Sequence, residues 1–549
     1  MKYLFVALLV AGLSAFLRPV GLPVADPKTA PPTAPNILWI SCEDMSPRLA
    51  CYGDTTIPTP NIDRLAREGI RFSNAFCTAG VCAPSRNAII TGMYQTSTGG
   101  HNMRTLYSTY PEKTGLPKQY SIVPPPDVRA FPEYLRKAGY YTTNNVKTDS
   151  QFEEPSTVWN EVSTKAHWRN RRADQPFFAI FNNTVTHESQ VWQRKDLPLR
   201  VDPARIKVPP YYPDTKTVRQ DMARFYSNIR DMDDWVGDLL KQLEDDGLLD
   251  KTIIFFWSDH GDGLPFVKRE IYDRGLRVPL IVRFPDGQRA GTVRPELISM
   301  IDLAPTVLSL AGLPTPKPMQ GRAFLGKFAE KKPRSYVFAA RDRLDSEYDR
   351  VRTVHDGRYQ YIRNFYPDRP LYMDIAFRKQ QPMMAEMLQM RDEGKLNAVQ
   401  MNWFRPTKPA EELYDLQTDP YELTNLADQP AYSEHLKRLR REMDRWLTDT
   451  RDLGGVPEKE LVRQWWQGRD EPPVTAAPTI RQQGGRLVFT CATPGASIAY
   501  KTADSPAGNS WQVYSEPLRL AQPTSVTAVA QRIGYSRSAE TAFTFQSVK

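Results

Sequence analysis

Residues 252–262 read TIIFFWSDHGD, a strand-like run that ends in a cluster of polar and charged side chains. A run that is apolar on both faces is typical of a strand buried inside a parallel sheet. Residues 175–181 (QPFFAIF) and 36–41 (NILWIS) have the same character. Over residues 218–246, apolar side chains recur at alternating steps of three and four, which predicts a long amphipathic helix. Buried strands that alternate with helices predict an α/β fold, with a mostly parallel sheet flanked by helices.

Polar side chains follow two of these strands at the point where each strand ends. Residues 42–44 (CED) come after the first strand, and residues 258–261 (SDHG) come after the strand at 252–257. Because the chemistry of parallel sheets lies at the carboxyl ends of the strands, we expect both groups to converge on one edge. Shorter elements are expected as helices at 60–68, 131–137 and 431–448, and as strands at 358–362, 487–491, 497–501 and 525–531.

The N-terminus has the pattern of a targeting segment. Met1-Lys2 precede an uncharged apolar run over residues 3–17, which is shorter than the roughly 20 residues of a membrane helix. This predicts a signal peptide over residues 1–25, export to the periplasm or the medium, and no stable membrane insertion after cleavage. An uncleaved N-terminal anchor is the alternative.

Composition narrows the class of protein. The chain has 549 residues, of which 40% are hydrophobic and 25% charged, so it is neither membrane-embedded nor disordered. A formal charge of +9 favours anionic ligands. The basic residues form no run with interleaved aromatics, so nucleic-acid binding is unsupported. Five cysteines without tight metal spacing indicate neither a disulfide scaffold nor a zinc protein, and the pairing of Cys42, Cys51, Cys77 and Cys491 stays open.

The most specific motif is residues 81–86 (VCAPSR), which is followed by Thr91-Gly92. Other segments occur around it in a fixed order: PNILWISCED (35–44), TPNIDRLAREGIRFSNAF (59–76), WSDHGD (257–262), RGLRVPLIVRFP (274–285) and ELYDLQTDPYELTNLA (412–427). Over residues 35–450 the chain resembles the sulfatase family, whose fold is that of alkaline phosphatase. The tail contains GASIAYKT (495–502), YSEPLRL (514–520) and SVTAVAQRIGYSRS (525–538), and in these stretches it resembles the β-sandwich module at the C-terminus of chitobiases and hexosaminidases. We expect this module to pack on the catalytic unit or to act as a spacer; glycan binding is the alternative.

The resemblance implies a domain order. The expected units are a signal peptide (1–25), a catalytic α/β domain with the alkaline-phosphatase-like sheet (34–326), a smaller α+β C-terminal subdomain (327–453), a linker (454–478) and an appended small β-sandwich (479–549).

The resemblance also implies that a maturase oxidises Cys82 to formylglycine (3-oxoalanine). A hydrated aldehyde carries two hydroxyl groups, of which one attacks sulfur and the other later loses its proton so that sulfate is expelled. The alternative for Cys82 is a buried structural cysteine.

Fixed positive charge is needed around a sulfuryl group in transfer. By resemblance, Arg86 holds the formylglycine hydrate, Lys268 binds a sulfate oxygen, and Lys147 corresponds to the lysine of the family's G-K-x-H segment. His187 matches the histidine that protonates the leaving group.

The expected metal site consists of Glu43, Asp44, Asp259 and His260 with the formylglycine oxygen at position 82. Carboxylates at strand ends repel one another unless a divalent cation lies among them, and oxygen-rich ligation favours Ca²⁺ before Mg²⁺. The family usually has Asp-Asp where this chain has Glu43-Asp44, so Glu43 is expected to coordinate differently or to shift the metal.

Substrate contacts are expected from His101, Asp149, Arg341 and Arg343. Asp149 stands where the family has the G-K-x-H histidine; a carboxylate can accept a proton when sulfate is expelled, but it cannot donate one as imidazolium does. For the two arginines, a structural ion-pair cluster is an equal alternative. The CED sequence at 42–44, the compact segment 256–275 and the pair His101-Asn102 resemble the branch that contains heparan N-sulfatase. This resemblance implies a sulfated sugar, with a sulfate ester or the sulfamate of an N-sulfoglucosamine end as the bond that is cut.

The sequence therefore predicts a Ca²⁺-dependent hydrolase that removes sulfate from a sulfated carbohydrate. Two alternatives remain: a phosphodiesterase or phosphonate monoester hydrolase of the same superfamily, and a non-catalytic glycan-binding protein.

Overall fold

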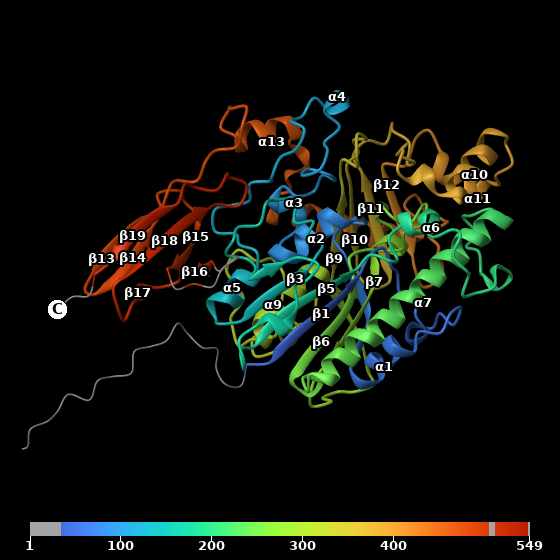
Figure 1. Ribbon diagram of the computed structural model, residues 1–549. Coiled ribbons are helices and arrows are strands. Elements are labelled where there is room, and N and C mark those ends of the chain that lie inside the picture. Colours follow the sequence, from blue (N-terminus) through green and yellow to red (C-terminus); the bar gives the residue numbers. More distant parts are fainter. Residues whose placement is uncertain (1–33, 504, 506–510, 547–549) are drawn as a thin grey trace, which may run out of the picture.

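The computed structural model describes residues 34–503, 505 and 511–546, so the predicted signal peptide (1–25) lies outside the described residues (Figure 1). The fold is built on an eight-stranded sheet in the order β4-β3-β5-β1-β6-β7-β2-β8. Its strands are β1 (Asn36–Cys42), β2 (Ile70–Phe76), β3 (Tyr141–Asn145), β4 (Glu161–Val162), β5 (Phe177–Asn183), β6 (Thr252–Ser258), β7 (Arg277–Arg283) and β8 (Thr292–Ser299). All neighbours are parallel except where β7 pairs with β6 and β2. The prediction of a mostly parallel sheet is confirmed.

The central strands are buried because their side chains are apolar on both faces. Every residue of β6 is buried, and so are all residues of β1 after Asn36. Trp39 of β1 packs edge-on against Phe178 and Trp257, with ring centroids 5.1 Å and 5.3 Å away. Burial of each such side chain contributes about 2–3 kcal/mol to the stability of the fold. The packing therefore stabilises β1 and β6, the two strands that end at the polar residues.

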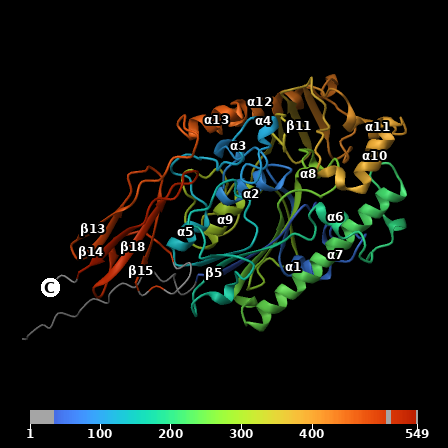
Figure 2. The same ribbon diagram turned by 45° about the horizontal axis from the view of Figure 1, so that its top comes forward.

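Helices cover both faces of the sheet. α1 (Pro60–Glu68) and α7 (Lys216–Asp245) lie on one side, whereas α2 (Cys82–Thr91), α5 (Pro132–Lys137) and α9 (Leu303–Leu310) lie on the other (Figures 1 and 2). α1 begins with proline at its first position, as predicted, and ends at Gly69. A Cβ on Gly69 would lie 2.5 Å from the carbonyl oxygen of Val282 in β7, so only glycine permits this close packing.

A second, antiparallel sheet follows in the order β12-β11-β10-β9. Its strands are β9 (Val337–Arg341), β10 (Val351–His355), β11 (Tyr359–Asn364) and β12 (Glu411–Asp415). α12 (Ser433–Asp449) packs on this sheet through Leu439 and Met443, which are fully buried. The other short helices of this half and of the catalytic half are α3 (Gln95–Thr98), α4 (Pro111–Thr114), α6 (Ser189–Gln193), α8 (Asp273–Leu276), α10 (Pro382–Asp392) and α11 (Ala398–Met401).

The C-terminal residues form two small antiparallel sheets around their own apolar core. The sheets are β13 (Thr479–Gln483), β14 (Arg486–Thr490) and β17 (Leu518–Arg519), and β15 (Ser497–Thr502), β16 (Gln512–Val513), β18 (Thr524–Gln531) and β19 (Thr541–Phe545). Leu487 and Val526 are fully buried between them. This module contacts the catalytic unit at α5, where the Ser497 hydroxyl donates to buried Glu133 at 2.7 Å.

Residues 454–478, expected to be a linker, include helix α13 (Glu458–Trp465). Glu458 is buried and accepts hydrogen bonds from Arg343 at 2.6 Å and 2.7 Å. The segment is therefore attached to the α+β unit by a buried ion pair.

Among the described residues, no helix combines the length and the apolar character that crossing a membrane requires.

Candidate active site

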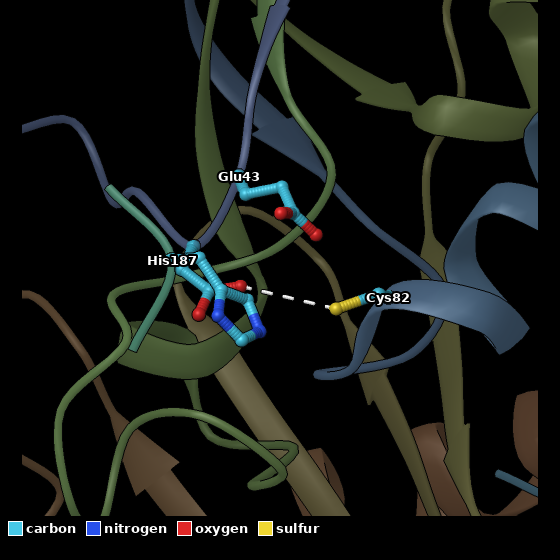
Figure 3. A group of neighbouring side chains, drawn as sticks. Glu43, Cys82 and His187 are labelled. Atoms are coloured by element: carbon cyan, nitrogen blue, oxygen red, sulfur yellow. Dashed lines mark hydrogen bonds between the residues drawn. The ribbon is translucent and has the colours of Figure 1, made fainter. Parts of the chain in front are cut away.

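Three elements bring the predicted site residues together at one edge of the large sheet. Residues 43–44 follow β1 and residues 259–260 follow β6, and these neighbouring parallel strands end in register. Cys82 is the first residue of α2. Figure 3 shows Glu43, Cys82 and His187 from three separate segments, with their side chains directed toward a common space. Parallel topology thus achieves the convergence that the sequence predicted.

Two overlapping groups of side chains have the geometry of a metal site. Glu43, Asp44, Cys82 and His187 offer ligand atoms within 4.8 Å of one another, and so do Cys82, Asp259 and His260. Cys82 belongs to both groups. Its sulfur lies 3.9 Å from Asp44 Oδ1 and 3.3 Å from His260 Nε2. A group at position 82 therefore faces the whole ligand set.

The orientation of His260 leaves one ring nitrogen available as a ligand. Nδ1 lies 2.9 Å from the carbonyl oxygen of Gly261, and because a carbonyl can only accept, Nδ1 carries a proton. Nε2 lies 3.1 Å from Asp44 Oδ1 and donates to it when the ring is protonated, whereas in neutral imidazole its lone pair is free for a metal. Although burial alone would lower it, Asp259 and Asp44 raise the pKa of His260 well above its ordinary value. The carboxylates thus attract positive charge to this position.

Asp44 is held in a strained but well-bonded conformation. Its φ is +52°, a left-handed value, and its N–H donates to Asp259 Oδ1 at 3.1 Å. Asp44 Oδ2 accepts from Lys268 Nζ at 2.6 Å and from the N–H of Glu188 at 2.7 Å. Although burial alone would raise it, Lys268 and the nearby histidines hold the pKa of Asp44 well below its ordinary value. Asp44 is therefore a carboxylate with Oδ1 directed at the ligand space.

Two further cations face Cys82 from other sides. Arg86 Nε donates to Asp259 Oδ2 at 2.9 Å, and its Nη2 is buried without a protein partner. Lys147 Nζ forms an ion pair with Glu43 and lies 3.0 Å from Asp149 Oδ2. Asp149 is thus at the margin of the site, beside Lys147.

His187 lies at the open side of the ligand set. Its Nδ1 is 2.9 Å from the Ser189 hydroxyl, which leaves Nε2 for the space in front of Cys82. Burial and then the charge of Lys268 lower the pKa of His187. Burial raises the pKa of the Cys82 thiol despite Lys268 and Lys147, so the unmodified side chain is a protonated thiol.

Sequence reasoning missed two buried residues that hold the site in place. Glu188 accepts two hydrogen bonds from Arg269, at 2.6 Å and 2.8 Å, and its Oε1 lies 3.1 Å from Lys268 Nζ. The two missed residues are Glu188 and Arg269. Each lies next to a predicted residue in the chain, since Glu188 follows His187 and Arg269 follows Lys268. Their position directly beside predicted site residues was the available signal.

The predicted substrate contacts His101, Arg341 and Arg343 lie in a different environment. Arg341 pairs with Glu270 and Asp349, and Arg343 pairs with Glu458; all five side chains are buried. These contacts favour the ion-pair alternative for the two arginines.

His101 is 5% exposed, and its Nδ1 has no protein partner. It lines a cavity of about 340 Å³ together with Asp342 and Arg343. None of the contacts described for it joins it to Cys82.

All five cysteines are free thiols, so none of the pairings left open by the sequence is formed.

Comparison with known proteins gives consistent matches. The sulfatase family model matches residues 35–313, and the model described as N-sulphoglucosamine sulphohydrolase, C-terminal, matches residues 261–406. An ulvan-active sulfatase from Formosa agariphila is 45% identical over 544 residues, covering 92% of this chain and 91% of that protein. The N-sulphoglucosamine sulphohydrolase of Homo sapiens is 26% identical and covers 83% of this chain and 98% of that protein. A solved structure bound to its substrate D-glucosamine-2-N,6-O-disulfate has a TM-score of 0.55 at 18% identity, covering 78% of this chain and 100% of that chain.

Proposed function

This chain belongs to the sulfatase family, and from that premise we propose that it removes sulfate from a sulfated carbohydrate, with position 82 as nucleophile and Ca²⁺ as the metal. One observation carries the proposal. The side chain of Cys82 lies in both groups of potential metal ligands, and three cations surround the same space. A non-catalytic glycan-binding protein would have no need for this combination.

The residues present fit a hard divalent cation. Glu43, Asp44 and Asp259 supply carboxylate oxygens, and His260 would offer Nε2 after losing the proton that Asp259 and Asp44 stabilise there in the absence of a metal. A cation held by this set would polarise a sulfate oxygen and lower the energy of charge that develops during transfer. Oxygen-dominated ligation favours Ca²⁺ before Mg²⁺. Glu43, which replaces the usual aspartate, reaches toward Lys147 as well as toward the ligand set, so it links the metal site to a cation.

Oxidation of Cys82 to formylglycine would replace a protonated thiol by a hydrated aldehyde with two hydroxyl groups. In the folded protein Cys82 is only 3% exposed. A maturase therefore has to reach the VCAPSR segment before the chain is folded.

Each of the three cations, Arg86, Lys147 and Lys268, would stabilise negative charge on a different part of the reacting group. Arg86 Nη2 has no protein partner and is free to donate to an oxygen at position 82. Lys268 and Lys147 would each donate to sulfate oxygens. A cation about 4 Å from a sulfate charge contributes about 4 kcal/mol at an effective dielectric of 20. Because both lysines also pair with carboxylates, the net contribution of each is smaller.

His187 is the group placed to protonate the leaving oxygen of the sugar. Its Nε2 faces the space in front of Cys82, and the arrival of a sulfate anion would favour its protonated form. Asp149, beside Lys147, is placed to accept a proton when sulfate is expelled.

The substrate is proposed to be a polysaccharide related to ulvan. The relative that is 45% identical is named for its activity on ulvan, whereas the human relative named for N-sulphoglucosamine is 26% identical. A polymer of this kind does not cross membranes, so the proposal includes export of the enzyme, in line with the signal peptide predicted from sequence.

The test is a desulfation screen with purified protein co-expressed with a formylglycine maturase. Ulvan oligosaccharides, N-sulfoglucosamine, N-acetylglucosamine 6-sulfate, an aryl sulfate and an aryl phosphonate would be compared. We expect sulfate release from ulvan oligosaccharides and loss of essentially all turnover in Cys82→Ala, with unchanged folding by circular dichroism.

Three outcomes would contradict the proposal. A preference for the aryl phosphonate would indicate the phosphonate hydrolase alternative. Retained turnover in Cys82→Ala would remove the nucleophile. An unmodified thiol in the tryptic peptide that contains Cys82, after expression with an active maturase, would favour binding alone.

A further inference from the structure

The C-terminal module shares a surface pocket with the catalytic unit. The pocket has a volume of about 350 Å³, within the range of about 300–1,000 Å³ that is usual for ligand sites. Four separate segments line it: the end of α3, the loop before α5, residues 451–467, and the module after β18. Helix α13, which supplies part of the wall, lies where the module adjoins the catalytic unit in both views (Figures 1 and 2).

The lining of this pocket carries positive charge that no acidic side chain neutralises. Arg451 and Arg532 line it, and no aspartate or glutamate does. Within the part of the chain that the structure describes, neither arginine has a carboxylate within ion-pair distance. By contrast, the buried Arg343 and Arg352 are both paired with carboxylates. Two arginines without counter-charges in one hollow favour an anionic ligand, since guanidinium groups bind planar or tetrahedral oxyanions through paired N–H donors.

The rings of the pocket are held in fixed positions. Trp465 packs directly on the backbone of Gly99, where an added Cβ would lie 2.5 Å from the indole. The Tyr535 hydroxyl accepts from Gln467 at 3.1 Å and from Arg532 at 3.3 Å. The Arg532 guanidinium also lies over the Tyr535 ring, 4.7 Å from its centroid, and its Nε is buried without a partner. Such preorganised rings and donors reduce the ordering cost of binding.

Rings next to cations and amide groups are the chemistry of a site for a charged sugar. An aromatic face covers the apolar side of a sugar ring, the side chains of Gln464 and Gln467 bond hydroxyl groups, and arginines bond a sulfate or carboxylate. We propose that this pocket binds an anionic sugar unit of the polysaccharide substrate, away from the unit that is desulfated. The identity of the polymer rests on the proposed function; the anionic sugar chemistry rests on the pocket.

The proposal also gives the C-terminal module a task beyond packing. Arg532 and Tyr535 belong to the module, whereas Arg451 and Trp465 do not. Neither part forms the pocket alone. Contacts between the module and α5, such as that of Ser497 with Glu133, hold the module against the catalytic unit and so keep the two walls of the pocket together.

The test compares Arg451→Gln/Arg532→Gln with Arg481→Gln in the full-length, matured enzyme. Arg481 is an exposed arginine of β13 that does not line the pocket, so this control removes one positive charge from the module and leaves the pocket unchanged. The readouts are kinetics on sulfated polysaccharide and on a small aryl sulfate, and affinity electrophoresis in gels that contain ulvan or neutral dextran.

We expect the double variant to raise KM for the polysaccharide about fivefold or more, with kcat and all aryl sulfate kinetics unchanged. Its retardation by ulvan should be lost, and the difference should shrink at high salt because exposed charges are screened. Behaviour equal to that of Arg481→Gln in both readouts would overturn the proposal. If no polysaccharide is desulfated but retardation by ulvan still depends on the two arginines, the proposed function fails and the pocket stands.

Discussion

Replacement of Lys268 by methionine tests the electrostatic basis of the site most directly. Lys268 is 3% exposed, and its Nζ lies 2.6 Å from Asp44 Oδ2 and 3.1 Å from Glu188 Oε1. Methionine has a similar volume and no charge, so Lys268→Met removes the cation and leaves the packing nearly intact.

The size of the effect follows from the distances. A sulfate charge about 4 Å from Nζ gains about 4 kcal/mol at an effective dielectric of 20. Asp44 and Glu188 already take up part of the lysine charge, so we expect a loss of about 2–4 kcal/mol of transition-state stabilisation. This corresponds to a fall in kcat/KM of about 30-fold to 1,000-fold, since about 1.4 kcal/mol equals a factor of ten.

The assay is kcat/KM for a sulfated substrate, with metal content measured by mass spectrometry and folding by thermal melting. Lys379→Met is the matched control, because Lys379 is 40% exposed and pairs with Asp374 on the surface. The control should keep full activity. A fall of less than about fivefold in Lys268→Met, with metal content unchanged, would refute the electrostatic argument.

Three further outcomes are expected. Glu458→Gln leaves buried Arg343 without its counter-charge and should lower unfolding stability by about 3–5 kcal/mol in a urea titration, whereas Glu460→Gln on the exposed face of the same helix should change nothing measurable. Asp221 accepts a hydrogen bond from the N–H of Met383, and burial raises its pKa to about 7. Because the folded-state pKa of Asp221 exceeds the ordinary value of 3.8, this carboxyl makes the free energy of unfolding fall as pH rises from about 4 to about 7, by at most about 1.4 kcal/mol per pH unit. Asp221→Asn should flatten that slope in urea titrations at pH 5, 6 and 7.5. An unchanged slope would contradict this assignment. Chelation with EDTA should abolish sulfate release, and Ca²⁺ should restore it better than Mg²⁺; full activity without any divalent ion would exclude the metal assignment.

Local pattern predicted the two strands that end at the site and the long helix that covers one face of the sheet. β1, β6 and α7 begin and end within two residues of the runs expected from apolar periodicity. These predictions were possible because the local spacing of apolar side chains indicates whether both faces of a strand, or one face of a helix, will be buried. The same spacing predicted that polar residues 42–44 and 258–261 would meet, since parallel strands end at one edge.

Pairings between distant charged residues could not be predicted in this way. Lys147 and Glu43 are brought together by β1 and the segment after β3, and nothing in the local sequence of either specifies the other. Arg343 was open between a substrate contact and a structural pair until α13 placed Glu458 against it. Such contacts depend on how whole elements pack.

By itself, the sequence predicted the two strands that end at the site, the long helix that lies between them in the chain, the VCAPSR motif around Cys82 and the resemblance to the sulfatase family. Only the tertiary structure decided which carboxylate each cation faces and that Arg451 and Arg532 share one pocket. The physical reason is that the strength of a charge–charge contact depends on the separation and burial of two atoms, and folding sets both for residues that are far apart in the chain.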